Sequence, residues 1–162
     1  MKKSLFLSLA LVLGACMSAP PPQKTQLEIR QLQTRSYDTK DVKMVIKAVM
    51  HALQDDNFMI KQANVELGLL TAQKEVEVGG SSFTVFLGRS SDQRVPNNAI
   101  TEASANISEF GDQTRVRINF QYKVVDNKGV TMEVERIEKA EFYQQFFSKV
   151  DKAVFLGKEK VQ

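Results

Sequence analysis

The sequence predicts an α+β fold of two layers, in which a curved antiparallel sheet is packed on one side by two amphipathic helices. Apolar residues recur with helical spacing over residues 38–56, and an aromatic stripe does so over residues 140–155. Between them, residues 100–110 and 114–126 alternate apolar and polar side chains, as strands with one buried face do. Since such strands need cover on their apolar face, we expect the two helices to supply it.

The first residues have the parts of a secretory signal. Lys2 and Lys3 give a positive start, an apolar run follows over residues 5–13, and small residues precede Cys16. The run is too short to span a bilayer, which needs about 20 apolar residues. We therefore interpret residues 1–15 as a signal peptide that is removed from the mature protein.

The end of this segment, Leu13-Gly14-Ala15-Cys16, resembles the bacterial lipobox. The resemblance implies a diacylglyceryl thioether on the Cys16 sulfur, cleavage before Cys16 and acylation of the new amine. The alternative is an ordinary signal peptide that happens to end in a cysteine. Cys16 is the only cysteine of the chain, so it has no intramolecular disulfide partner. Because two or more acyl chains anchor a protein stably, we expect Cys16 to hold the mature protein at a membrane surface.

The lipidated Cys16 begins a proline-rich tether over residues 16–26, whose three consecutive prolines favour an extended backbone. Met17 and Ser18 follow the cysteine. In lipoproteins resembling those of enteric bacteria, an Asp at this place retains the protein in the inner membrane. The absence of Asp favours the outer membrane, with the domain facing the periplasm.

Composition indicates one domain of near-neutral charge after the anchor. The chain has 162 residues with 22 basic and 19 acidic side chains, and removal of the signal takes two lysines away. No basic patch is dense enough to predict nucleic-acid binding. We expect a single α+β domain over residues 27–157 and a frayed tail over residues 158–162.

The first two elements of the domain are predicted to be a strand and a long helix. Residues 27–36 carry alternating apolar positions and are interpreted as a strand. In the helix, Asp38 or Thr39 is expected to cap the amino end. The apolar stripe of the helix consists of Val42, Val45, Ile46, Val49, Met50 and Leu53.

The middle of the chain is predicted to hold shorter strands and turns. A strand begins at residues 58–60, a turn spans residues 64–68, and a second strand covers residues 69–78. Gly79-Gly80-Ser81-Ser82 is a flexible turn; without the lysine of a P-loop, it is not interpreted as a phosphate site. After an alternating stretch at residues 83–87, residues 88–99 are predicted to be a long loop, which is either a contact surface or mobile.

The two alternating segments that follow predict an antiparallel hairpin. On the first strand, Ala103, Ala105 and Ile107 share a face, and residues 111–113 form the turn. On the second strand, the inward face is predicted to consist of Val116, Ile118, Phe120, Tyr122 and Val124. Three cations point outward, as a solvated face or as a binding face for acidic groups: Arg115, Arg117 and Lys123. A turn at residues 126–129 and a short strand at residues 130–134 follow.

The last helix carries the aromatic stripe and is predicted to end before Gly157. The stripe consists of Phe142, Phe146, Val150, Ala153 and Val154, with Tyr143 and Phe147 alongside. Such a stripe is interpreted as core in preference to a ligand box.

No group of residues in the sequence makes a catalytic or metal-binding set. His51 has no second His and no free Cys to complete a metal site, and is interpreted as a structural or surface residue. Asp55 and Asp56 are adjacent carboxylates at a helix end, where water is expected to reach them, so they are not interpreted as an acid–base pair. We predict no catalytic residue, no metal and no cofactor other than the covalent lipid on Cys16.

A family resemblance rests on residues 36–74, through Leu53, Phe58, Ile60, Leu67, Gly68 and Leu70. The segment resembles the repeated domain of the BamC (NlpB) lipoprotein of the outer-membrane β-barrel assembly machine, and other small proteobacterial lipoproteins with helix-grip domains. The resemblance implies a helix-grip-like fold. The chain departs from BamC in having one such domain and a short tether, so a relative that serves a secretion or motility apparatus is equally compatible.

Three functions are weighed on this basis. The first is a non-enzymatic outer-membrane lipoprotein that acts as an accessory or structural subunit of an envelope assembly or secretion complex, with other envelope proteins as partners. The second is a periplasmic module that binds a lipid or other hydrophobic ligand in a groove between helix and sheet, lined by Phe120, Phe142 and Phe146. The third, a cell-wall hydrolase, would need a nucleophile or paired carboxylates in a cleft.

Overall fold

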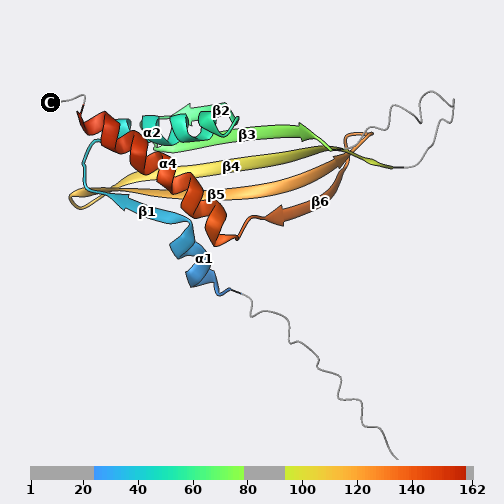
Figure 1. The fold of residues 1–162 in the computed structure, drawn as a ribbon, viewed down its shortest axis with the longest axis horizontal. Helices are drawn as coiled ribbons and strands as arrows, with labels where there is room; N and C mark the ends of the chain where they lie inside the picture. The colour runs from blue at the N-terminus through green and yellow to red at the C-terminus, as the bar shows by residue number, and fades with distance from the viewer. Residues whose placement is uncertain (1–23, 79–93, 160–162) are drawn as a thin grey trace, which may run out of the picture.

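The computed structural model describes residues 24–78 and 94–159. Within these ranges, six antiparallel strands form one sheet, and three helices accompany it (Figure 1). The strands are β1 (Thr34–Tyr37), β2 (Met59–Asn64), β3 (Leu69–Glu77), β4 (Pro96–Phe110), β5 (Gln113–Asp126) and β6 (Thr131–Arg136). The helices are α1 (Gln26–Leu32), α2 (Val42–Asp55) and α4 (Ala140–Glu159). The α+β class predicted from the sequence is confirmed.

The long hairpin of β4 and β5 forms the centre of the sheet. The strand order is β1-β5-β4-β3-β2, and β6 also pairs with β5. Strands β1 and β6 share one edge of β5, with β1 opposite Thr114–Arg117 and β6 opposite Gln121–Val125. On the other side, β2 pairs with β3 only from Leu69 to Gln73. The sheet is therefore five strands wide at the β1 end and narrower at the β6 end.

Helices α2 and α4 cover the same face of the sheet (Figure 1). In the row Ala72–Ala103–Phe120, two small residues lie beside one large ring on that face. The alanines leave room for the helix side chains, so that large and small residues interdigitate as in a well-packed core. The largest fully buried side chains include Tyr143, Phe120, Phe147, Leu53 and Leu70.

The predicted long helix is confirmed, but its cap is a different residue. Asp41, and not Asp38 or Thr39, is the N-cap of α2, and its carboxylate accepts from the Met44 amide at 2.9 Å. Thr39 instead accepts from the Asp41 amide through its hydroxyl. The helix ends before Asn57, which adopts a positive φ of 62°. Asn tolerates this left-handed conformation better than most residues do, which explains the end of the helix at this point.

The predicted strand at residues 27–36 is wrong for most of its length. Residues 26–32 form α1, and only residues 34–37 form a strand. Thr25 and Glu28 make a capping box that satisfies the first amides of this helix. Ile29 is buried while Leu27 is 66% exposed, so the apolar alternation of this segment does not follow burial.

Two other predicted boundaries are also wrong. Residues 96–99 were predicted to be loop but begin β4, where Pro96 takes the first position of the strand beside a bulge, one of the places where a strand tolerates proline. Helix α4 does not end before Gly157 but continues to Glu159. A Cβ on Gly157 would lie 3.1 Å from the Met44 side chain, so glycine here allows α4 to approach α2 closely.

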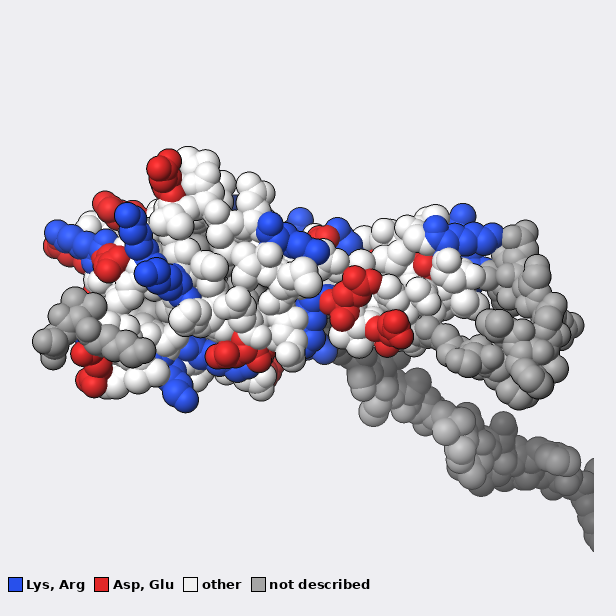
Figure 2. Space-filling view, turned by 90° about the horizontal axis from the view of Figure 1, so that it is seen from above, with Lys and Arg blue, Asp and Glu red and all other residues white. Residues whose placement is uncertain are grey.

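One end of the sheet extends beyond the helices, and we call it the strand arm: residues 74–78, 94–102 and 121–136. Figure 1 shows the strands running on past α2 and α4, and Figure 2 shows uncharged surface between the charged side chains of this part. The predicted inward residues Tyr122 and Val124 are only half-buried here, and Val76 and Val78 are about half exposed, at 48% and 49%. The alternation of the strands places these side chains on the helix-facing side of the sheet, but no described helix covers that side in the strand arm.

Candidate functional site

Several residues singled out in the sequence lie outside the described residues. These are Cys16 with the signal and tether, the Gly79–Ser82 turn, the alternating stretch at 83–87, residues 88–93 of the predicted loop and the last three residues of the tail. Their proposed roles remain predictions. The candidate sites below are built from residues 24–78 and 94–159.

The two aspartates at the end of α2 do not act together. Asp56 makes an ion pair with Lys149 of α4, whereas Asp55 is exposed. His51 is exposed one turn before Asp55. The Asp56–Lys149 pair links the carboxyl end of α2 to the middle of α4. It is a contact between helices, and the arrangement contains no buried carboxylate pair of the kind that acid–base catalysis uses.

The three outward cations of β5 are placed as predicted, and two of them have partners. Lys123 pairs with Glu102 on β4 at 2.6 Å, and the guanidinium of Arg115 stacks on the Phe110 ring, 3.3 Å from its centroid. Arg117 is exposed beside Asn106 of β4. This face is a polar sheet surface on which one cation is ion-paired across the strands and another is stacked on an aromatic ring.

The aromatic residues proposed to line a ligand groove pack against one another instead. Phe120 contacts Phe142 and Phe146 edge to face, with centroids 4.8 and 5.2 Å apart, and it also contacts Phe58 and Tyr143. Phe120 and Phe146 are 2% and 3% exposed. A ligand in this position would have to displace the rings, so they form part of the core, as the sequence interpretation of the stripe favoured.

A second candidate site is an extended groove on the outer side of the helical layer. It has a volume of about 920 Å³ and lies between α2 and α4. The helices are antiparallel along it, since Gly157 lies against Met44 at one end and Lys149 pairs with Asp56 at the other. Its floor is apolar, with Met44, Ala48, Ala153 and Leu156 among its residues, and its rim carries Lys43, Lys47, His51, Lys149 and Lys152.

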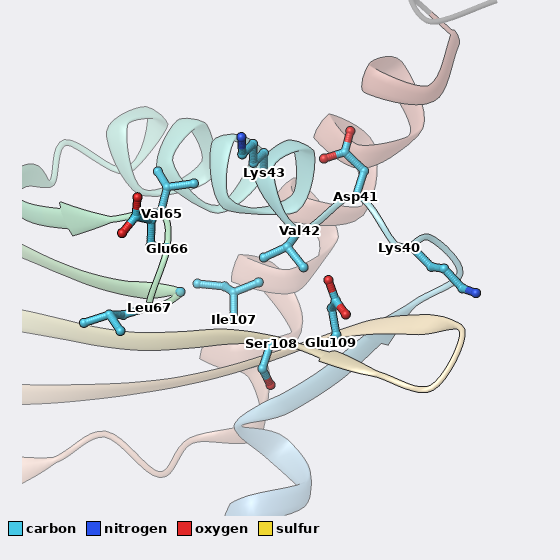
Figure 3. Close-up of a pocket in the computed structure, with 11 residues that line it drawn as sticks. Lys40, Asp41, Val42, Lys43, Val65, Glu66, Leu67, Ile107, Ser108 and Glu109 are labelled. Atoms are coloured by element: carbon cyan, nitrogen blue, oxygen red, sulfur yellow. The ribbon is translucent and has the colours of Figure 1, made fainter.

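A smaller hollow of about 550 Å³ lies where the start of α2 meets the turn between β2 and β3 (Figure 3). Val42 and Ile107 lie beside it, while Lys40 and Asp41 point away from it in Figure 3. Lys40 pairs with Asp112 outside the hollow. With few convergent polar groups inside, the hollow does not resemble a small-molecule site.

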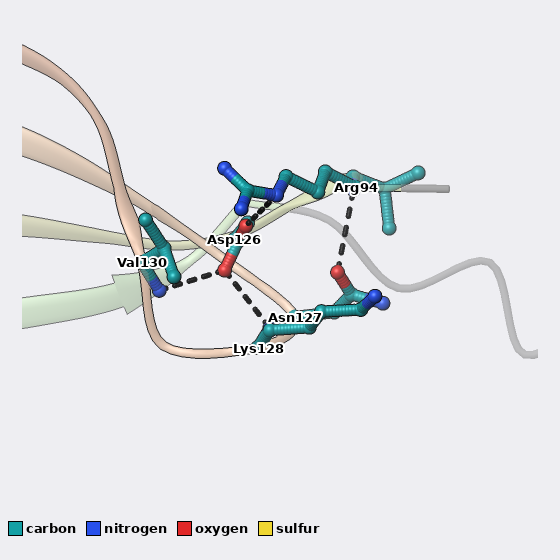
Figure 4. A network of polar contacts seen from close by, with 6 residues as sticks. Arg94, Asp126, Asn127, Lys128 and Val130 are labelled. Atoms are coloured by element: carbon teal, nitrogen blue, oxygen red, sulfur yellow. Dashed lines mark hydrogen bonds and ion pairs between the residues drawn. The ribbon is translucent and has the colours of Figure 1, made fainter. Parts of the chain in front are cut away.

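A buried carboxylate holds the tip of the strand arm together (Figure 4). Asp126 accepts from the amides of Val130 at 2.7 Å and Lys128 at 2.9 Å, and its other oxygen lies 3.6 Å from Nε of Arg94. The hydrogen bond from the Val130 amide is the main reason why the pKa of Asp126 lies below its usual range. The neighbouring Asn127 binds Val95 through its amide and its side chain. The network closes the β5–β6 turn and fastens it to β4.

The strand arm exposes several apolar side chains to solvent. Six of them are between 42% and 53% exposed: Val76, Val78, Val95, Val130, Met132 and Val134. They come from neighbouring strands or the turns next to them, with Val76 in the row of Val124 on the helix-facing side and Val134 opposite Lys123 on the other side. Clusters of exposed apolar residues mark interaction sites more often than scattered single ones do. No sequence pattern predicts this exposure directly, because alternation shows which face of a strand is apolar but not how far the helices reach.

The described part of the chain holds no group of three or more His, Cys, Asp and Glu residues able to bind a metal ion. No helix within it is both long and apolar enough to cross a membrane. Comparison with known protein families and with curated protein sequences finds no match for this chain. The arrangement of its residues therefore carries the functional argument.

Proposed function

We propose that the protein is a non-enzymatic outer-membrane lipoprotein, anchored through Cys16, that acts as an accessory or structural subunit of an envelope assembly or secretion complex. The lipobox-like tetrad at residues 13–16 supports the anchor, and Met17 in place of Asp favours the outer membrane. The anchored domain faces the periplasm, and its partners are other envelope proteins.

The single observation that carries the binding role is the exposed apolar surface of the strand arm. Val76, Val134 and Met132 are about half exposed, although an apolar side chain in contact with water is unfavourable. A domain that builds a long hairpin and leaves its end without helical cover has a surface suited to another protein. The polar network at Asp126 fastens the β5–β6 turn to the residue before β4, so that binding at this turn orders little of the chain.

A helix-grip domain like that of BamC is part of the proposal. Of the residues on which the resemblance rests, Leu53, Phe58 and Leu70 are buried in the core. Gly68 lies in a turn with a positive φ of 64°. These positions are the ones a shared fold would need, which supports a relation in fold and leaves the complex served by this chain to experiment.

Binding of a lipid or other hydrophobic ligand between helix and sheet is the alternative function, and the packing does not favour it. Phe120, Phe142 and Phe146 fill the space that the ligand would occupy. Native mass spectrometry of the protein purified from its own envelope tests this alternative. A reproducible bound mass would support the ligand-binding function.

Chemical crosslinking in intact cells, followed by detergent extraction and mass spectrometry, tests the main proposal. We expect the wild-type protein to carry an acyl label, to fractionate with the outer membrane and to give crosslinks to another envelope protein. A Cys16→Ser variant is the matched control and should lose the acyl label and its place in the outer-membrane fraction. A strictly monomeric protein without any reproducible partner would contradict the proposed function.

A further inference from the structure

We propose that the groove between α2 and α4 is a second docking site, separate from the strand arm, for an acidic amphipathic helix of a partner protein. The inference rests on the proposed function, since it needs another envelope protein as the partner. The groove lies at the opposite end of the domain from the strand arm. Its residues determine the chemistry of the segment that binds there.

The floor of the groove is apolar and open. Met44 and Ala48 of α2 face Ala153 and Leu156 of α4 across it. Leu156 is 49% exposed although it lies near the end of a well-formed helix. Gly157, which contacts Met44, lies eight positions after Lys149, which pairs with Asp56; this step along α4 is about 12 Å, or roughly two helical turns.

Basic residues flank this floor with helical spacing. Lys43 and Lys47 are four residues apart along α2, with His51 one turn further on, so they form a row on one wall. Lys152 of α4 stands on the other wall. Carboxylates spaced by four residues on a docked helix would match the spacing of the α2 row.

The positive charge of the groove is not neutralised by the described part of the chain. Lys43, Lys47 and Lys152 make no ion pair with any residue of 24–78 or 94–159. Lys149 is the exception, since it pairs with Asp56. Two acidic residues also line the groove: Asp41 accepts from the Met44 amide as the N-cap of α2, and Asp55 is exposed one turn after His51, so the four lysines outnumber the carboxylates by two. A ligand that brings carboxylates would therefore meet unpaired cations.

A helix suits this site better than a membrane surface does. The groove between two antiparallel helices accepts the ridge of a third helix, whose apolar residues at i, i+3 and i+4 reach the floor while acidic residues on both flanks reach the lysines. A flat anionic membrane would attract Lys43, Lys47 and Lys152 but would not fill a concave groove that reaches down to the buried Ala48. The apolar floor and the cationic rim together therefore indicate that an amphipathic helix binds in the groove.

Site-specific photocrosslinking of the full lipoprotein in its own envelope tests the inference. We place p-benzoylphenylalanine at Gln54, which is exposed on the groove, and at Gln62 of β2 as the control position. We expect Gln54 to capture a segment of another protein with apolar residues at helical spacing and flanking carboxylates. Capture of a second copy, of lipid alone, of a segment without carboxylates, or of nothing would overturn the proposal.

A charge reversal measures the role of the lysines. The variant Lys47→Glu/Lys152→Glu should reduce the Gln54 adduct by about tenfold or more, because two attractions become repulsions. The control Lys61→Glu/Lys139→Glu changes two exposed lysines outside the groove and should leave the adduct unchanged. Equal loss in both variants would overturn the inference.

A vesicle assay separates a protein partner from a membrane. The unlipidated chain with Cys16→Ser is floated with vesicles of phosphatidylcholine and phosphatidylglycerol. We expect Lys47→Glu/Lys152→Glu to leave flotation unchanged, and a loss of flotation would identify the groove as a membrane contact. If crosslinks from the arm persist while Gln54 captures no acidic segment, only this inference fails. If neither surface yields a partner, the proposed function fails as well.

Discussion

Replacement of Gly68 by alanine should destabilise the domain strongly, because this glycine combines two requirements. Its φ is 64°, and a Cβ built on it would lie 1.8 Å from the Ile107 carbonyl oxygen. Its own carbonyl accepts from the Ile107 amide at 2.8 Å. An alanine must therefore adopt a left-handed conformation and also push the β2–β3 turn away from β4.

The magnitude follows from these two terms. A left-handed conformation costs a non-glycine residue about 1–2 kcal/mol. Movement of the turn away from β4 weakens the hydrogen bond to Ile107, which contributes about 0.5–1.5 kcal/mol, and opens the packing beside it. We expect Gly68→Ala to reduce the free energy of unfolding by about 3 kcal/mol.

Gly111 provides the matched control. Its φ is 61°, nearly that of Gly68, but no atom lies within 4 Å of a Cβ built on it. Gly111→Ala should therefore show only the conformational cost of about 1–2 kcal/mol. Urea unfolding of the purified chain, followed by circular dichroism, measures both variants. Equal losses for Gly68→Ala and Gly111→Ala would refute the close contact between the turn and β4.

Three further predictions concern the core, the arm and the anchor. Phe120→Ala should cost about 3–5 kcal/mol in urea unfolding because four aromatic rings pack on Phe120, whereas Phe155→Ala, at a site 60% exposed, should stay within about 0.5 kcal/mol. Since the pKa of Asp126 is lowered on folding, its stabilising contribution is present above the unfolded pKa of about 3.9 and is lost as the pH falls through the lower folded value. The slope of unfolding free energy against pH below 4 should decrease in Asp126→Asn; an unchanged slope would show that the carboxylate is not held as described. Mass spectrometry of the mature amino terminus should find acyl groups on Cys16, and an unmodified cysteine would refute the anchor.

The elements that the sequence predicts best are those whose local pattern and tertiary burial agree. The stripe of α2 is confirmed because Val45, Val49 and Leu53 are all buried in the core. The β4–β5 hairpin is confirmed because Ala105 and Ile118 share a face as alternation requires. In α2 the buried residues follow the helical period, and in the hairpin they follow the alternation of a strand.

The wrong boundaries come from competing local or tertiary causes. In α1, the capping box of Thr25 and Glu28 selects a helix where short apolar alternation also fits a strand. At Gly157, helix packing against Met44 overrides the usual tendency of glycine to end a helix. Neither cause can be recognised from the spacing of apolar residues in the sequence.

The candidate surfaces were harder to predict than the fold. The spacing of Lys43, Lys47 and His51 can be read from the sequence, but Lys152 is brought beside them only by the packing of α4 on α2. The exposure of Val76 likewise depends on where the helices stop, whereas Val134 lies beside Lys123 on the opposite face of the sheet. Both surfaces result from tertiary packing, which single-sequence periodicity does not describe.

The proposed role of the strand arm is tested most directly by a photocrosslinker at its edge. We place p-benzoylphenylalanine at Val134, which is 53% exposed on β6, and at Gln144 of α4 as a control outside the arm and the groove. In cells that make the lipidated protein, Val134 should give one reproducible adduct with another envelope protein, and Gln144 should not. If Val134 yields only uncrosslinked monomer, the arm is not a binding surface, and the account of this protein as an envelope subunit is contradicted.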